Sequence, residues 1–250
     1  MSGERVVILG ALSAIAEETA RLFAAEGAHL MLVARDAARL DVLAADLRLR
    51  GAAEVAVAAM DLAEAEDAQT KLSTWTQTLG GVDTVLLFYG ALGDQARSES
   101  DLAAARAVLD VNFTSQALWS LAAAQAFEAQ RRGSLVMVSS VAGDRGRMSN
   151  YVYGAAKGGL AILGQGIAHR LAQVGGEARA VVVKLGFVRT PMTQGFDRSG
   201  PLWADASTAA AAIHRAASAG GPVVYAPWFW RFVLLAIRLA PAAIFHKTRL

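Results

Sequence analysis

The stretch LVMVSSVAGDRGRMSNYVYGAAKGGL (residues 135–160) contains a strand pattern, a short polar loop and a helix pattern in direct succession. Its apolar run, which ends in Ser139 and Ser140, is typical of a buried strand. Neighbouring strand residues point to opposite faces, so we expect Ser140 to face the site and Ser139 to be structural. Tyr153 and Lys157 are four residues apart, which places them on one face of a helix. The stretch therefore predicts that a serine, a tyrosine and a lysine meet at a strand end.

These three side chains suit proton transfer to a carbonyl oxygen. A phenol with a pKa of ~10 is a poor acid at neutral pH, and a neighbouring lysine ammonium favours its phenolate. Ser140 can hold a carbonyl oxygen while Tyr153 protonates it. Tyr151 lacks this arrangement, because Ala155 stands four residues after it. The pattern predicts reduction of a ketone or oxidation of an alcohol.

Further features accompany this pattern. Asn112 lies in the segment VNFTS, a glycine turn begins at Gly10, and Ser140 precedes Tyr153 by 13 residues. In this order and at these distances the chain resembles the short-chain dehydrogenase/reductase family. The resemblance implies that Tyr153 is the general acid/base, with Lys157 lowering its pKa and binding the nicotinamide ribose. It also implies that Ser140 orients the carbonyl oxygen and that Asn112 continues a proton relay through water.

Strand and helix patterns alternate along the chain. Continuous apolar runs predict strands at 5–10, 28–34, 54–60, 83–89, 134–140, 178–185 and 223–227. Helix patterns include 13–26, with Ser13 as a candidate N-cap, and 36–50, for which Asp36 is a candidate cap. This alternation predicts a single-domain α/β fold, a Rossmann-type doubly wound parallel sheet with helices on both faces. Residues 1–227 would form the dinucleotide-binding and catalytic domain, and 228–250 a tail that is part of it or interfacial.

The first strand–turn–helix is the predicted pyrophosphate site. Members of the resembled family usually carry Gly-x-x-x-Gly-x-Gly there, whereas this chain has Gly10, then Ala14 and Ala16 in place of the second and third glycines. An alanine methyl narrows the approach of the backbone to a phosphate. We expect Gly10, Ser13, Ala14 and Ile15 to contact the cofactor; a tight turn without a ligand is the alternative.

The end of the second strand predicts the cofactor. An NAD site usually has a carboxylate there and an NADP site an arginine. Here Ala34 occupies the usual acidic position and Arg35 follows it, so NADP(H) is favoured over NAD(H). A solvated surface arginine is the alternative interpretation.

Family resemblance implies the remaining cofactor contacts. Asp61 and Leu62 resemble an adenine-contacting pair. Gly90 alone remains of the usual Asn-Ala-Gly, since Phe88 and Tyr89 replace the first two residues. In LGFVRTPM, Leu185 replaces a proline, whereas Gly186, Val188 and Thr190 stand at the expected positions. Together with Tyr153 and Lys157, these residues complete the predicted cofactor site.

The loops at 91–100 and 141–150 are expected to line the substrate entrance. The second carries Asp144, Arg145 and Arg147, which suit a polar or phosphorylated substrate. The alternative is a loop tied by its own salt bridges. The whole chain is similar to reductases of lipid-linked 2-keto pentoses, so a small-molecule or lipid-linked carbonyl substrate is expected.

Composition limits the other classes of function. The chain has no cysteine, and its four histidines are scattered without ligand spacing, so no metal site is predicted. No secretory signal precedes the first strand, which predicts a cytoplasmic protein. Although the pI is about 9.1, no nucleic-acid-binding motif accompanies it, so no nucleic-acid partner is expected. A homodimer or homotetramer is the expected assembly.

The C-terminal tail is apolar and basic. Residues 228–250 carry a charge of +4, and no acidic residue follows Asp205. Trp228, Phe232, Leu235 and Leu239 follow helical spacing, and Trp230, Arg231 and Arg238 flank them. The tail predicts either peripheral contact with the inner face of a membrane or packing on the protein itself. A catalytically weak dinucleotide sensor or scaffold, or a membrane-surface interaction protein, remains an alternative to an enzyme.

Overall fold

The computed structural model describes residues 3–248, and its centre is a parallel sheet of seven strands in the order β3-β2-β1-β4-β5-β6-β9. The strands are β1 (Arg5–Leu9), β2 (His29–Ala34), β3 (Glu54–Ala59), β4 (Thr84–Leu87), β5 (Arg132–Ser140), β6 (Glu177–Leu185) and β9 (Val223–Ala226). Each coincides, to within a few residues at its ends, with a strand that the sequence predicts. The doubly wound parallel sheet is therefore confirmed.

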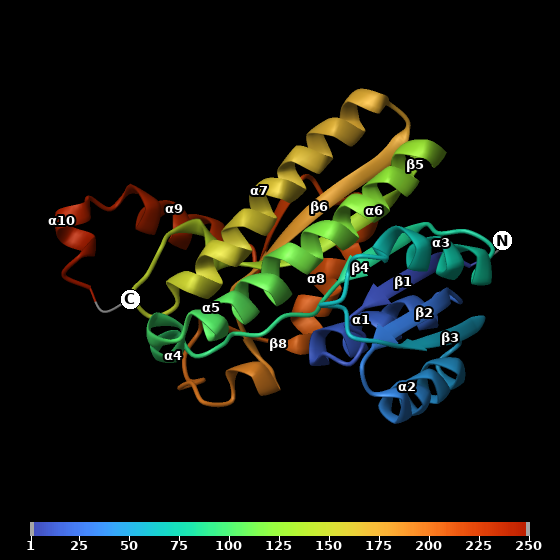
Figure 1. Cartoon of the computed structure of the whole chain (residues 1–250), viewed down its shortest axis with the longest axis horizontal. Helices are drawn as coiled ribbons and strands as arrows, with labels where there is room; N and C mark the ends of the chain where they lie inside the picture. Colours follow the sequence, from blue (N-terminus) through green and yellow to red (C-terminus); the bar gives the residue numbers. More distant parts are fainter. Residues whose placement is uncertain (1–2, 249–250) are drawn as a thin grey trace.

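Helices cover both faces of this sheet (Figure 1). One face carries α1 (Ala14–Ala25), α2 (Ala37–Leu49) and α8 (Ala206–Ala219), and the other carries α3 (Ala68–Thr78), α6 (Ser115–Gln130) and α7 (Tyr151–Val174). The shorter elements are α4 (Gln95–Ser100), α5 (Leu102–Leu109), a π-helical turn at Asp110–Thr114, and 3-10 turns at Val141–Asp144 and Pro191–Thr193. The chain ends in α9 (Trp230–Leu239) and α10 (Ala242–Phe245).

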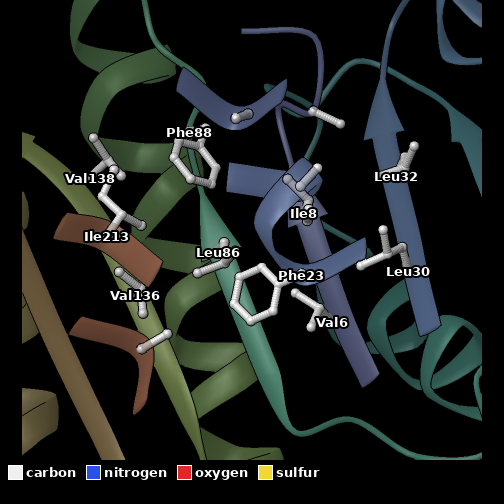
Figure 2. Close-up of a cluster of buried hydrophobic side chains, with 14 of the residues drawn as sticks. Val6, Ile8, Phe23, Leu30, Leu32, Leu86, Phe88, Val136, Val138 and Ile213 are labelled. Carbon is white, nitrogen blue, oxygen red and sulfur yellow. The ribbon is translucent and has the colours of Figure 1, made fainter. Parts of the chain in front are cut away.

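Alternate residues of the strands fill two separate cores. Val6, Ile8, Leu30 and Leu32 face α1 and α2, as Figure 2 shows together with Phe23 of α1. Their sequence neighbours along the strands face α3, α6 and α7 instead. Because both faces of the inner strands are buried, these strands read as continuous apolar runs, whereas the edge strands β3 and β9 are partly exposed.

Local side chains start the first two helices. The Ser13 side chain accepts a hydrogen bond from the backbone N–H of Ala16, and the Asp36 side chain accepts one from Arg39. Both residues are therefore the N-caps that the sequence predicts. Capping holds the start of α1 at the carboxyl end of β1.

The strand order reverses between β1 and β4, which are neighbours in the sheet although two strands separate them in sequence. In such sheets, ligands bind at this point, outside the carboxyl ends of the strands. Gly10 follows β1, Gly90 follows β4, and Ser140 ends β5. The topology thus brings the predicted site residues to one edge of the sheet.

A small second sheet pairs β7 (Phe187–Arg189) with β8 (Trp203–Asp205) in parallel, and the sequence analysis did not predict it. The rings of Phe187 and Trp203 stack across it with centroids 5.1 Å apart. Within residues 3–248, no helix has the length and apolar character that crossing a bilayer requires.

Candidate active site

A cavity of about 400 Å³ opens at the carboxyl ends of the strands, at the point where the strand order reverses. Most of the residues predicted to act in catalysis or cofactor binding line it: Ser13, Ala14, Ile15, Gly90, Asn112, Ser140, Tyr153, Lys157, Gly186, Val188 and Thr190. Segments from several parts of the chain thus converge on one space. Four predicted cofactor residues, Gly10, Arg35, Asp61 and Leu62, are not among its lining residues.

Ser140 sits at the turn from β5 into the 3-10 segment. Its hydroxyl oxygen accepts a hydrogen bond from the backbone N–H of Ala142 at 3.1 Å. That bond fixes the side chain while leaving its O–H free to donate to a carbonyl oxygen. Ser139 points elsewhere, because its hydroxyl donates to the backbone carbonyl of Lys157 at 2.8 Å. Although Ser139 also lines the cavity, this bond ties its side chain to α7, which is consistent with a structural role.

Tyr153 lies in the first turn of α7 and lines the cavity. Burial raises the pKa of its phenol to about 12, and the Ser140 hydroxyl acts in the opposite direction. Tyr151 is exposed and is not among the lining residues, as the sequence predicts.

Lys157 is buried one helical turn after Tyr153, and its Nζ donates to the backbone carbonyl of Val138 at 3.1 Å. Burial lowers the pKa of Lys157 to about 7. We expected the lysine charge to lower the pKa of the phenol, but burial is the dominant effect on both groups. Both are removed from water, which disfavours a charge on either.

Asn112 is fully buried in the π-helical turn. Its Nδ2 donates to the carbonyls of Ala91 at 2.7 Å and Val108 at 2.8 Å, and its Oδ1 accepts from the N–H of Ala91 at 3.2 Å. These bonds fix the segment that follows β4. A Cβ on Gly90 would lie 2.6 Å from Asn112 Oδ1, so only glycine lets the two segments approach this closely.

The turn after β1 fits a pyrophosphate despite its missing glycines. Gly10 has a φ of +85°, and a Cβ there would lie 2.7 Å from the backbone nitrogen of Tyr89, so glycine is required. The backbone N–H groups of Ala14 and Ile15 line the cavity at the start of α1 and have no acceptor within residues 3–248. Such free amides at a helix N-terminus suit an anionic oxygen.

Two arginines, Arg35 and Arg39, follow β2. The Arg35 side chain is 80% exposed, with its Nη1 4.0 Å from Asp61 Oδ2. Of these two, Arg39, in the first turn of α2, lines the cavity, and its Nη2 lies 3.5 Å from Glu17 Oε1. Sequence analysis missed Arg39, because Arg35 precedes the N-cap Asp36 and helical spacing therefore does not relate the two arginines. Leu62 is buried, and its backbone carbonyl accepts a hydrogen bond from the Trp119 indole at 3.0 Å.

The segment after β6 is packed tightly at Gly186. A Cβ on this residue would lie 1.8 Å from the indole nitrogen of Trp230 in α9. Val188 is buried in β7, and its carbonyl accepts a hydrogen bond from the Thr193 hydroxyl at 2.8 Å. Helix α9 therefore packs directly against the segment after β6, which lines the cavity.

The 141–150 loop is tied to the body of the protein rather than to itself. Asp144 forms an ion pair with Lys184 and accepts a hydrogen bond from the Tyr225 hydroxyl at 2.6 Å. Arg145 donates to the backbone carbonyls of Ile237 and Ala240 at the end of α9. Arg147 remains: it lines the cavity and has no hydrogen bond or ion pair within the described residues, and burial lowers its pKa. Of the three charged residues, Arg147 is the one that lines the cavity.

Apolar side chains that sequence analysis did not single out complete the cavity: Leu92, Val141, Phe187, Met192, Phe196 and Trp203. They come from loops and from the small sheet, where no periodicity marks a residue as lining a site. No group of three or more His, Asp or Glu side chains in residues 3–248 is arranged to hold a metal ion.

Comparison with known proteins identifies the family. Residues 4–199 match the model of the short chain dehydrogenases. The chain is a short-chain dehydrogenase/reductase. It is 38% identical to an uncharacterized oxidoreductase of Mycobacterium tuberculosis over 242 residues, which are 97% of this chain and 96% of the relative.

Solved structures agree with the fold of this short-chain dehydrogenase. One short-chain dehydrogenase/reductase family protein superposes with a TM-score of 0.77 at 26% identity, covering 90% of this chain and 97% of the other. A variant of actinorhodin polyketide ketoreductase, whose crystal structure was solved with NADPH, superposes with a TM-score of 0.78 at 21% identity. The alignment covers 89% of this chain and 95% of that ketoreductase.

Proposed function

We propose that this protein is an NADPH-dependent ketoreductase in which Tyr153 is the general acid. One observation carries the proposal: Ser140, Tyr153, Lys157 and Asn112 all line the cavity that forms where the strand order reverses. A site that only binds a dinucleotide has no use for a phenol placed beside a serine hydroxyl and a buried lysine.

Each side chain has a distinct task in this proposal. Bound NADPH supplies the hydride that the carbonyl carbon receives. Ser140 donates a hydrogen bond to the carbonyl oxygen, and Tyr153 gives that oxygen a proton, so the ketone gains a hydride and a proton and becomes an alcohol. With a pKa of about 7, Lys157 changes its charge near neutral pH, and its ammonium form stabilises the phenolate left on Tyr153. Asn112 holds Ala91 and continues the proton relay through water.

Preference for NADPH over NADH is supported by Arg35 and Arg39, which provide positive charge where the ribose 2′-phosphate of a dinucleotide would lie. Arg39 lines the cavity, and Ala34, the last residue of β2, stands where an NAD site usually has a carboxylate. The free amides of Ala14 and Ile15 would hold the pyrophosphate, and Gly186, Val188 and Thr190 would contact the nicotinamide end.

The proposed substrate is a ketone with an apolar body and one polar or anionic group. Apolar residues such as Leu92, Phe187 and Phe196 suit the body, and Arg147, which has no ion-pair partner within residues 3–248, suits the polar group. A lipid-linked keto sugar combines both properties. We also propose a homo-oligomer that works in the cytoplasm or at the inner face of a membrane.

The test is a turnover screen. Purified protein is mixed with NADPH or NADH and with matched pairs of ketones that carry or lack an anionic group, and the reduced nicotinamide is followed by its absorbance. The proposal predicts faster turnover with NADPH, and a rise in KM for anionic ketones when Arg147 is replaced by alanine. An absence of turnover with every ketone, despite measurable NADPH binding, would favour a dinucleotide sensor instead.

A further inference from the structure

Helix α9 has two apolar faces. The inner face packs on the protein through Trp230 and Leu234, which are buried against Val141 in a small separate core. The Trp230 ring meets the Phe187 ring edge-on, with centroids 5.0 Å apart. The sequence left two options for the tail, and on this face the helix packs on the protein itself.

The inner face also fixes the position of α9 relative to the active site. Trp230 fills the space above Gly186 that a Cβ would otherwise occupy. At the other end of the helix, Arg145 donates to the carbonyl of Ala240 at 2.8 Å, and its guanidinium lies 3.8 Å from the centroid of the Phe245 ring in α10. Two contacts from cavity-wall segments therefore hold α9 and α10 in place.

The outer face is the stripe that the sequence singled out, and residues 3–248 leave it largely exposed. Trp228, Phe232, Leu235, Leu239 and, in α10, Ile244 have exposed fractions between 51% and 73%. In Figure 1, α9 and α10 (red) extend away from the sheet as an arm beside the loop that precedes α7. This many large apolar side chains gathered on one projecting element mark an interaction surface.

The charged residues of the tail around this face are all positive. Arg231 and Arg238 of α9 and Lys247 after α10 are all exposed, and no acidic residue follows Asp205. Helices that lie in a lipid interface combine an apolar face bearing tryptophan, phenylalanine and leucine with flanking arginine and lysine.

We propose that the outer face of α9 and α10 docks on an anionic lipid bilayer, with the apolar side chains among the acyl chains and the cations at the headgroups. A second copy of the chain is a poorer occupant, because in a two-fold contact the patch meets itself. Three cations would then face three cations, with no acidic side chain in the tail to neutralise them. Because Trp230 on the inner face packs against Gly186 and Phe187, which line the cavity, docking would place the cavity near the bilayer surface. The proposal is independent of the reaction catalysed.

The test is co-sedimentation of the full chain with vesicles. One set is phosphatidylcholine alone, and the other is an equal mixture of phosphatidylcholine and phosphatidylglycerol. We expect binding to the anionic set that weakens as salt is raised. The variant Phe232→Glu/Leu235→Glu should bind at least tenfold more weakly. Arg231→Gln/Arg238→Gln should lose about 25-fold, since each cation near an anionic surface contributes about fivefold.

The matched control is Val42→Glu/Leu49→Glu, which places two glutamates at exposed apolar positions of α2, far from the tail in sequence. It should bind vesicles like the unmodified protein. All four residues replaced by glutamate are exposed, so each variant should fold, which circular dichroism checks. No binding to anionic vesicles at low salt would overturn the proposal, as would equal losses in both glutamate variants. The face would belong to a second copy of the chain if two results occurred together. The unmodified chain would not bind vesicles, and light scattering would show that Phe232→Glu/Leu235→Glu breaks an oligomer.

Discussion

Replacing Asp144 by alanine should destabilise the protein strongly, because this carboxylate is the buried partner of two groups. Its side chain is 1% exposed, and that of its ion-pair partner Lys184 is 10% exposed. It also accepts the hydrogen bond from Tyr225, whose pKa burial raises to about 12, so this phenol stays a donor throughout the neutral range.

The expected loss follows from what remains after the substitution. Removing one member of a buried ion pair leaves the other charge uncompensated, which costs about 3–5 kcal/mol. For a domain of this size, that corresponds to a fall in Tm of about 6–20 °C. Replacing both members by apolar residues, as in Asp144→Leu/Lys184→Met, leaves no buried charge and should recover most of the loss.

Urea unfolding followed by tryptophan fluorescence would measure these free energies. Tyr225→Phe is a useful intermediate, because it removes one hydrogen bond to a charged acceptor, worth about 1.5–3 kcal/mol. A loss of less than about 1 kcal/mol for Asp144→Ala, or a double variant no more stable than the single one, would show that the pair does not hold the loop.

Three further predictions concern the cofactor site and its ionisable groups. Because the pKa of Lys157 falls from 10.5 to about 7 on folding, the unfolded chain binds the extra proton between these values. Stability without cofactor should therefore rise from pH 7 towards pH 10 in urea titrations, and Lys157→Met should abolish that rise. Arg39→Ala should weaken NADPH binding about ten- to a hundredfold with little change for NADH in fluorescence titrations, and Arg35→Ala should do so less. Gly90→Ala should lower kcat, since its methyl group would displace Asn112; an unchanged kcat would refute that reading of the contact.

Much of the fold could be predicted because its determinants are local. Each of the seven strands is an apolar run between turn residues, and Ser13 and Asp36 mark the two helix starts that they cap. The Tyr153 and Lys157 pair needs only helical spacing to share a face. Each of these features depends on a few neighbouring residues, so it can be predicted from the sequence alone.

Other features depend on partners far apart in the chain. Asp144 pairs with Lys184 and Tyr225, 40 and 81 residues away, and Arg145 reaches the end of α9, so neither is free for substrate. The pairing of β7 with β8 involves strands of three residues each, too short to show a pattern. Membrane contact and packing on the protein both predict the same amphipathic helix in the tail. Only the tertiary structure shows that the inner face of this helix is buried.

Single-turnover kinetics of Tyr153→Phe, at saturating NADPH and with a ketone found in the turnover screen, test the central claim most directly. The variant keeps the ring and loses only the hydroxyl, so NADPH should bind with unchanged affinity. The rate of the chemical step should fall by about two or more orders of magnitude, the usual contribution of a positioned proton donor. Tyr151→Phe, altered on the exposed side of the same helix turn, should react like the unmodified protein. A Tyr153→Phe variant that reduces the ketone at the normal rate would contradict the assignment of Tyr153 as the general acid.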